Sequence, residues 1–493
     1  MPTEQLEIET KYDVDEMTHL PALHELPGVA SVAQPVELEL EAVYFDTEAL
    51  ALAANKVTLR RRTGGEDDGW HVKFPKSSGA RLEVQFPLGR AVRKVPIAIV
   101  RTVRVHVRDN ELVPVVTLRT RRVVHRLLDA NGDVLAELAD DHVTATTGDG
   151  EPDSWREWEV ELVGGDRELL EAAETVLRAA GAEPAAGPSK LARALGDRVP
   201  AGDEWELPAK PRTADVFRAY AAEQVQAIRQ RDPEVRRDAP EGIHKFRVAT
   251  RRLRSALATY RPVIDRAAGD EIRAELKWLA GELGVARDAE VQREHFAAEV
   301  AAQPVELVLG RVAGRIDDHL RGVYKEGRAG ALAALESERY FRLLDTLDQL
   351  IAEPPLTDDN RKAAKQLPEL LDHDKRRMRK AVRRAQNALT AEDQDHELHE
   401  VRKSAKRLRY AGESVVPVLS DGSELATRAE EVQEVLGDFQ DSVVSRELLR
   451  ELAVQVHLDG GNAFTFGRLH ALAEARGKAS TAAFFELWPS LDF

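Results

Sequence analysis

Alternation of charged and uncharged residues is the feature of this sequence that most restricts its fold. In the segment Glu7-Ile8-Glu9-Thr10-Lys11, two carboxylates and an ammonium share one face if the segment is a β-strand, because successive side chains of a strand point to opposite faces. Ile8 and Thr10 occupy the other face. Such a row is either a solvated strand face or a functional face, with acids for a divalent cation and a base for its anionic ligand.

The period of two continues through the first third of the chain and predicts about eight antiparallel strands. Gly, Pro, Asp and Asn turns separate them, and we expect helices near residues 19–26 and 95–105. The predicted strands are residues 4–12, 36–45, 56–63, 69–74, 80–87, 113–127, 134–144 and 155–162. Strands of this number suit a closed barrel or a strongly curved sheet.

Most of these predicted strands repeat their charges on a single face. The residues concerned are Arg60 and Arg62, His71 and Lys73, Arg81 and Glu83, Arg119 and Arg121, Glu137 and Asp141, and Glu157, Glu159 and Glu161. If these faces pointed outward, small or polar residues such as Thr10, Arg61 and Ala80 would have to fill the core. We therefore expect a charged tunnel, in which acids require cations and Arg and Lys require a polyanion. Phosphate chains with Mg²⁺ satisfy both requirements.

These residues resemble the signature of the CYTH domains, the triphosphate tunnel metalloenzymes. Six motifs occur in the family's order: Glu7-x-Glu9-x-Lys11, Tyr44-Phe45-Asp46-Thr47, Leu59-Arg60-x-Arg62, Trp70-x-x-Lys73, Arg81-x-Glu83 and Glu159-x-Glu161. The resemblance covers about residues 3–197. It implies an eight-stranded antiparallel tunnel that hydrolyses or rearranges triphosphates with Mg²⁺ or Mn²⁺. Members include inorganic triphosphatases, thiamine triphosphatases and class IV adenylyl cyclases.

The resemblance also implies roles for individual residues. The implied catalytic residues are Glu7, Glu9, Lys11, Glu159 and Glu161, and the implied metal ligands are Glu7, Glu9, Asp141, Glu159 and Glu161, with Glu137 as a helper. The implied substrate-binding residues are Lys11, Arg60, Arg62, Lys73, Arg81, Arg119, Arg121 and Lys190. Asp140 and Asp141 compete for one family position, and we choose Asp141 because it shares a face with Glu137. Which two of Glu157, Glu159 and Glu161 bind metal stays open.

The second half of the chain has the helical period almost throughout and predicts an all-α helical bundle. It contains an internal repeat: residues 244–254 align with residues 399–409, and residues 283–288 align with residues 436–441. We expect two similar bundles related by a pseudo-twofold axis. The fold class is therefore α+β with several domains: residues 1–197 form the tunnel, residues 198–212 form a linker that contains prolines, and residues 213–493 form the helical domain.

Basic residues of the helical half fall on one face of each predicted helix. They are His244, Arg247, Arg251 and Arg254 in the first repeat, His399, Arg402, Lys406 and Arg409 in the second, and Arg376, Arg379 and Arg383 on a third basic helix. Bunched cations repel one another unless an anion lies between them, so these faces suit an extended polyanion. This half resembles the CHAD domain, a helical polyphosphate-binding module often fused to CYTH. The resemblance implies that these residues bind polyphosphate.

Composition restricts the remaining functional classes. The net charge of −16 argues against non-specific nucleic-acid binding. The chain has no cysteine, which excludes disulfides and fits a reducing compartment, and it has no apolar run long enough to span a membrane. We predict a cytoplasmic, Mg²⁺- or Mn²⁺-dependent inorganic triphosphatase that also binds long-chain polyphosphate. The alternatives are a non-catalytic polyphosphate-binding or granule-associated protein, an adenylyl cyclase and a thiamine triphosphatase. The oligomeric state stays open.

Overall fold

The computed structural model describes residues 3–76, 80–89, 94–148, 150–200, 205–491 and 493. The chain divides into two compact units, residues 1–203 and 204–493, which we call the β unit and the helical unit. Residues 201–204 of the predicted linker lie outside the described residues. None of the described helices has both the length and the apolar content that a bilayer crossing requires.

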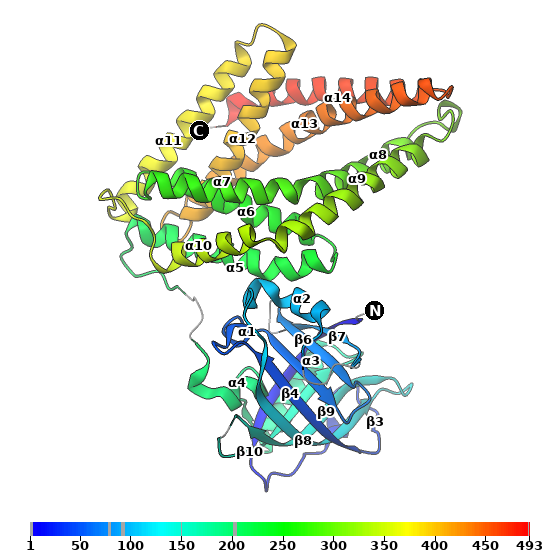
Figure 1. Cartoon of the computed structure of the whole chain (residues 1–493), viewed down its shortest axis with the longest axis vertical. Helices are drawn as coiled ribbons and strands as arrows, with labels where there is room; N and C mark the ends of the chain where they lie inside the picture. Colours follow the sequence, from blue (N-terminus) through cyan, green and yellow to red (C-terminus); the bar gives the residue numbers. More distant parts are fainter. Residues whose placement is uncertain (1–2, 77–79, 90–93, 149, 201–204, 492) are drawn as a thin grey trace. The chain divides into compact units, whose positions relative to one another are not determined.

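The β unit is built on one antiparallel sheet that curls into a barrel (Figure 1). In sheet order, its strands are β1 (Thr3–Glu7), β7 (Arg81–Phe86), β6 (Gly69–Pro75), β5 (Thr58–Thr63), β4 (Val36–Asp46), β8 (Val113–Leu128), β9 (Val134–Thr146), β10 (Asp153–Leu162), β2 (Glu9–Val14) and β11 (Glu183–Pro184). Only Ile8 separates β1 from β2. This single stretch pairs with β7 through β1 and with β10 through β2, so it joins the two sides of the sheet.

The described residues contain eleven strands, whereas the sequence predicts eight. The first predicted strand is split at Ile8, and the two-residue strands β3 (Ser31–Val32) and β11 are too short to show a period. The predicted helix at residues 19–26 is wrong, since only the 3₁₀ turn Leu23–Glu25 forms there. Pro21 and Pro27 explain this difference, because proline lacks an amide donor and disfavours a helical residue before it. The helix predicted at residues 95–105 is α2 (Ile97–Val107).

Helices cover apolar side chains on the outside of the barrel. Leu169 and Leu177 of α3 (Arg167–Ala179) share a buried cluster with Trp158 and Val160 of β10. A second cluster joins residues of α2 to the outward side chains of β5, β6 and β7: Ile99, Val103, Leu59, Val72 and Val84. Full burial of one such side chain stabilises a fold by about 1.5–3 kcal/mol. On β5, β6, β7 and β10 the apolar residues between the charged ones are therefore buried on the outside, which leaves the charged residues that alternate with them on the inside.

The short helix α4 (Lys190–Leu195) plugs the barrel. Its residues Leu191 and Leu195 pack with Tyr44 and Leu118, which lie on the inner faces of β4 and β8 and also line the internal cavity. The side chain of Ser189 accepts a hydrogen bond from the Ala192 amide and fixes the start of the helix. This arrangement directs the first residue of α4, Lys190, into the cavity.

Asp46 gives part of the Tyr44-Phe45-Asp46-Thr47 motif a structural role. Its carboxylate is fully buried and accepts hydrogen bonds from the amides of Thr47, Leu52 and Ala53. These bonds anchor the short helix α1 (Ala51–Ala54) to the end of β4. The acidic residue of this motif therefore holds a turn.

The helical unit consists of helices packed mainly as antiparallel neighbours (Figure 1). Those described are α5 (Thr213–Arg236), α6 (Gly242–Thr259), α7 (Arg266–Glu282), α8 (Gly284–Ala301), α9 (Val312–Leu335), α10 (Glu338–Ala352), α11 (Ala363–Gln386), α12 (Ala391–Val415), α13 (Gly422–Leu458) and α14 (Phe464–Leu487). α6 and α12, which carry the two predicted basic faces, contact each other. Asp374 of α11 is buried and pairs with Thr259 of α6 and Arg407 of α12.

Candidate functional site

A cavity of about 340 Å³ lies within the barrel, and charged side chains of both signs line it. The acids are Glu7, Glu9, Glu66, Asp67, Glu83, Glu137, Glu159 and Glu161, and the bases are Lys11, Arg60, Arg62, Lys73, Arg81, Arg122, Arg126 and Lys190. A barrel of this size ordinarily fills its interior with apolar side chains. This interior instead holds polar groups of both signs, many of which pair with one another.

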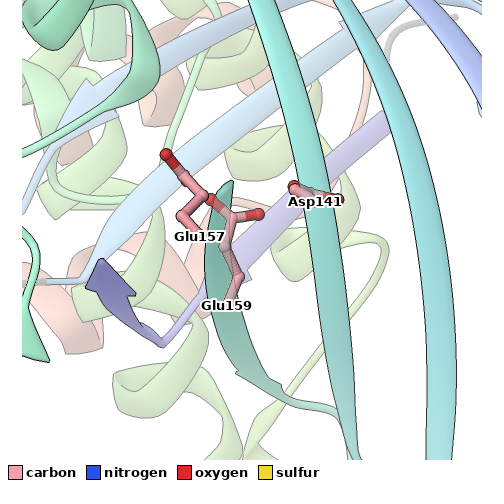
Figure 2. A group of neighbouring side chains, drawn as sticks. All are labelled: Asp141, Glu157 and Glu159. Atoms are coloured by element: carbon pink, nitrogen blue, oxygen red, sulfur yellow. The ribbon is translucent and has the colours of Figure 1, made fainter. Parts of the chain in front are cut away.

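Three buried carboxylates gather on β9 and β10 (Figure 2). One oxygen each from Asp141, Glu157 and Glu159 lie within 4.8 Å of one another, which is a spacing that could hold a metal ion. Arg122 of β8 donates to both oxygens of Asp141 at 2.7 and 2.6 Å and to Glu159 at 2.6 Å. The Nζ of Lys190 lies 2.6–2.9 Å from all three carboxylates.

Glu9 and Glu161 lie opposite each other on β2 and β10. Lys11 pairs with Glu9 at 3.0 Å and donates a short hydrogen bond to Glu159. Glu161 makes no ion pair with any described residue, and burial raises its pKa above the usual range. These two acids are therefore less neutralised than Asp141 and Glu159, which are surrounded by cations.

Glu7 and Glu83 form the other acidic part of the cavity, with Lys73 between them. Lys73 donates to Glu7 at 2.5 Å and lies 3.0 Å from Glu83. Burial, followed by the hydrogen bond with Glu83, raises the pKa of Glu7 to about 8. His71, fully buried, contacts Glu83 through Nδ1 and the Asp67 carbonyl through Nε2. Burial lowers the pKa of His71 to about 4, so the ring is neutral at physiological pH.

β5 and β7 add three more cations to the cavity. Arg60 lies beside the hydroxyl of Tyr44 and 3.9 Å from Glu83, and Arg81 donates to the Pro188 carbonyl at 2.8 Å. Arg62 pairs with Asp67 of the β5–β6 turn. Burial, and then the charges of Arg60 and Arg122, lower the pKa of Arg62 to about 9. An entering anion would relieve this mutual repulsion.

In the helical unit, four residues form a basic cluster where α6 meets α12. These are Arg247, Arg251, Arg402 and Lys406, which we call the α6–α12 cluster. Burial, and then the charges of the three arginines, lower the pKa of Lys406 to about 7. Such a shift means that the charged form of Lys406 is destabilised in the free protein by its burial and by the cations around it.

The remaining predicted basic residues have different surroundings. Arg409 is engaged by Glu413 at 2.9 Å and Glu430 at 2.6 Å, and Arg376 and Arg379 lie near Asp372. Arg383 is exposed on α11. His399 contacts Gln440 at 2.5 Å, and Arg254 lies near Arg251 and Arg273. Burial, and then the charge of Arg287, lower the pKa of His244.

Comparison with known proteins places both units in families. Residues 5–195 match the CYTH domain family, and residues 219–450 match the CHAD domain family. The uncharacterized protein Rv2226 of Mycobacterium tuberculosis is 40% identical over 491 residues, which cover 95% of this chain and 93% of that protein. The chain is a CYTH–CHAD protein. Proteins with a CYTH domain are triphosphate-tunnel enzymes, and the β unit is a member of this tunnel family.

Solved structures also resemble parts of the CYTH–CHAD chain. PptA from Streptomyces chartreusis is 23% identical and has a TM-score of 0.49, covering 56% of this chain and 99% of its own. The CHAD domain from the plant Ricinus communis is 26% identical and has a TM-score of 0.46, covering 59% of this chain and 96% of its own.

The placement of Arg119 and Arg121 inside the CYTH tunnel is wrong. Their side chains are 77% and 45% exposed, and they pair with Glu41 and Glu37 on the outer face of β4. Arg122 faces the cavity in their place. Alternate residues of β8 point to opposite faces of the sheet, and both faces carry charges. The prediction assigned the outer face of β8 to the tunnel.

The structure adds residues that the sequence did not assign to the site. Arg122, Arg126, Glu66 and Asp67 all line the CYTH cavity. Glu83, which the sequence placed on a tunnel face without a role, also lines it. Asp140 pairs with Arg156 at 2.8 Å, whereas Asp141 pairs with the cavity residue Arg122, so the choice of Asp141 agrees with the geometry. Along β4, apolar residues alternate with Glu37, Glu39 and Glu41, which point outward. These acids are the signal that could have placed Arg119 and Arg121 on the outer face as their partners.

Proposed function

We propose that the CYTH domain hydrolyses inorganic triphosphate to diphosphate and phosphate with Mg²⁺ or Mn²⁺, and that the CHAD domain binds long-chain polyphosphate. The observation that carries the first part is the cavity itself, which presents acids and bases in equal number within about 340 Å³. A linear triphosphate needs positive groups to bind its oxygens, and its divalent cation needs carboxylates as ligands, so both signs of charge must lie within one cavity.

The donor set fits a hard divalent cation. Carboxylates of Glu7, Glu9 and Glu161 lie on neighbouring inner-face positions of β1, β2 and β10, and they offer the oxygen ligands that Mg²⁺ and Mn²⁺ prefer. The absence of thiols from the chain leaves these hard ligands without soft competitors. A cation held there would neutralise phosphate oxygens and lower the pKa of a water molecule.

The cationic residues supply binding and orientation. Arg60, Arg62 and Lys73 line one side of the cavity, and they would grip phosphate oxygens in place of Glu83 and Asp67. Water would attack the terminal phosphorus, and the bond from that phosphorus to the bridging oxygen would break. The charge that develops on the departing diphosphate would be met by these fixed cations, which is the main contribution a protein makes to phosphoryl transfer.

A second candidate substrate is an organic triphosphate. The inner face of β4 is apolar, and Val36, Leu38, Leu40 and Ala42 line the cavity there. Such a wall offers contact to a base or another organic group, which favours a nucleotide or thiamine triphosphate as the alternative. With ATP, the products then separate hydrolysis from cyclisation.

A substrate panel tests the proposal. The full chain is incubated with triphosphate, ATP or thiamine triphosphate across a titration of Mg²⁺ and Mn²⁺, and phosphate, diphosphate and cyclic AMP are measured. We expect phosphate release to be fastest from inorganic triphosphate and to require the metal. Faster turnover of an organic triphosphate would favour the second candidate. No turnover of any triphosphate would favour a protein that only binds phosphate chains.

The α6–α12 cluster supports the second part of the proposal. Arg247 is oriented by the Gly284 carbonyl at 3.0 Å and by Asp288 at 2.8 Å, and Arg402 lies close to Gly437 and Asp441. Partly buried cations on two packed helices favour an extended anion with several phosphates over a single ion.

The pH dependence of polyphosphate binding follows from Lys406. Its pKa of about 7 in the free protein would rise when a polyanion binds, so binding takes up a proton above that pH. We expect the dissociation constant for long-chain polyphosphate to rise by up to about tenfold per pH unit above neutrality. Calorimetry at a series of pH values measures this slope. The Lys406→Met variant should bind more weakly with a flatter profile, and an unchanged slope in that variant would contradict the assignment.

A further inference from the structure

The ammonium of Lys190 lies where a metal ion would lie in the Asp141–Glu157–Glu159 group. Its Nζ is 2.9 Å from Asp141, 2.7 Å from Glu157 and 2.6 Å from Glu159. These are the same three carboxylates whose oxygens approach one another closely enough to hold a cation (Figure 2). One group of acids therefore has two candidate occupants.

The carboxylate oxygens of this group already have partners. Arg122 takes both oxygens of Asp141 and one oxygen of Glu159, and Lys11 donates to the other oxygen of Glu159. The second oxygen of Glu157 accepts a hydrogen bond from the Trp155 indole at 2.5 Å. Oε1 of Glu157 pairs with Lys190, so an entering metal ion would have to displace Lys190 to reach it.

Lys190 is held rigidly in this place. It is the first residue of α4, whose start is fixed by Ser189 and whose residues Leu191 and Leu195 are buried in the core that plugs the barrel. The Lys190 side chain is only 10% exposed.

We propose that Lys190 is a built-in cation that replaces a metal ion in the Asp141–Glu157–Glu159 group. This inference rests on the proposed function, since it concerns the metal ligands of the same tunnel. It removes Asp141 and Glu159 from the metal ligands that the sequence suggests.

Counting bound Mn²⁺ tests the inference. The full chain is titrated with Mn²⁺, and free Mn²⁺ is followed by electron paramagnetic resonance. We expect Lys190→Met to bind one more Mn²⁺ per chain than the unmodified protein, because the vacated group then accepts the ion. The double variant Lys190→Met/Glu157→Gln should lose this additional ion. An equal count in Lys190→Met and the unmodified protein would overturn the inference.

Two matched variants keep the test decisive. Arg193→Met removes a cation from the same helix that pairs with Asp13 instead, and it should leave the count unchanged. Glu157→Gln in the unmodified background keeps Lys190 in place and should also leave the count unchanged. A loss of one ion in Glu157→Gln would overturn the inference even if Lys190→Met failed to fold. An unmodified protein that binds no Mn²⁺ would instead contradict the metal dependence of the proposed function, while the gain in Lys190→Met would still report on Lys190.

Discussion

Replacing Glu9 with glutamine should lower triphosphate turnover by at least about 100-fold at a fixed metal concentration. The substitution keeps the shape of the side chain but removes the carboxylate that lies opposite Glu161 on β2 and β10. Lys11 would still pair with Glu159, so we expect the fold to be retained. Phosphate release under metal concentrations from limiting to saturating measures both the affinity for the metal and the maximal rate.

Glu39→Gln is the matched control for Glu9→Gln. Glu39 is an exposed residue on the outer face of β4, opposite Arg121. Its substitution therefore makes the same chemical change outside the cavity. Its activity should equal that of the unmodified protein. If Glu9→Gln kept most of its activity, or if both variants lost activity equally, Glu9 would have no special role in catalysis.

Replacing Arg122 with methionine should destabilise the β unit by about 3–5 kcal/mol, because it removes one partner of a buried charged network. Asp141 is fully buried and would lose its two-pronged contact with the guanidinium. Lys190 would remain as its only cation within ion-pair distance among the described residues. Urea denaturation of the full chain, with hydrogen exchange in β8, β9 and β10 as the readout, reports the β unit separately from the helical unit.

Arg121→Met tests whether the face of β8 on which the arginine lies, and not the loss of a charge as such, determines the loss of stability. Arg121 is partly exposed on the outer face and pairs with Glu37 at 3.2 Å. A surface ion pair of this kind contributes little, so the free energy of unfolding should change by less than about 1 kcal/mol. Equal destabilisation by Arg121→Met and Arg122→Met would mean that the assigned inner and outer faces of β8 are incorrect.

Much of the tunnel could be predicted because the alternation of side chains between the two faces of a strand can be seen in a short stretch of sequence. Glu7, Glu9 and Lys11 keep their shared face through the break at Ile8, and Arg60, Lys73 and Arg81 line the cavity as their alternation predicts. The basic faces of α6 and α12 could be predicted equally well, because the helical period alone places their basic residues on one side of each helix. Arg247, Arg251, Arg402 and Lys406 come together across the two helices.

The rest depended on contacts between distant segments. β8 carries charges on both faces, so only its register with Glu37 and Glu41 of β4 shows that Arg119 and Arg121 point outward. Arg409 lies on the predicted basic face, yet Glu430 of α13 occupies it. Lys190 could be assigned to the cavity only by resemblance, because its position depends on how α4 packs into the barrel. Period and spacing carry no information about such tertiary partners.

A crystal structure of the full chain with Mn²⁺ and a triphosphate analogue that resists hydrolysis tests the central claim most directly. The inward charges of the barrel should bind both, with an anomalous Mn²⁺ peak beside Glu9 and Glu161 and phosphate density against Arg60 and Lys73. Phosphate and Mn²⁺ found only on the outer surface, with the internal ion pairs of the barrel intact, would contradict the claim that this cavity is a triphosphate site.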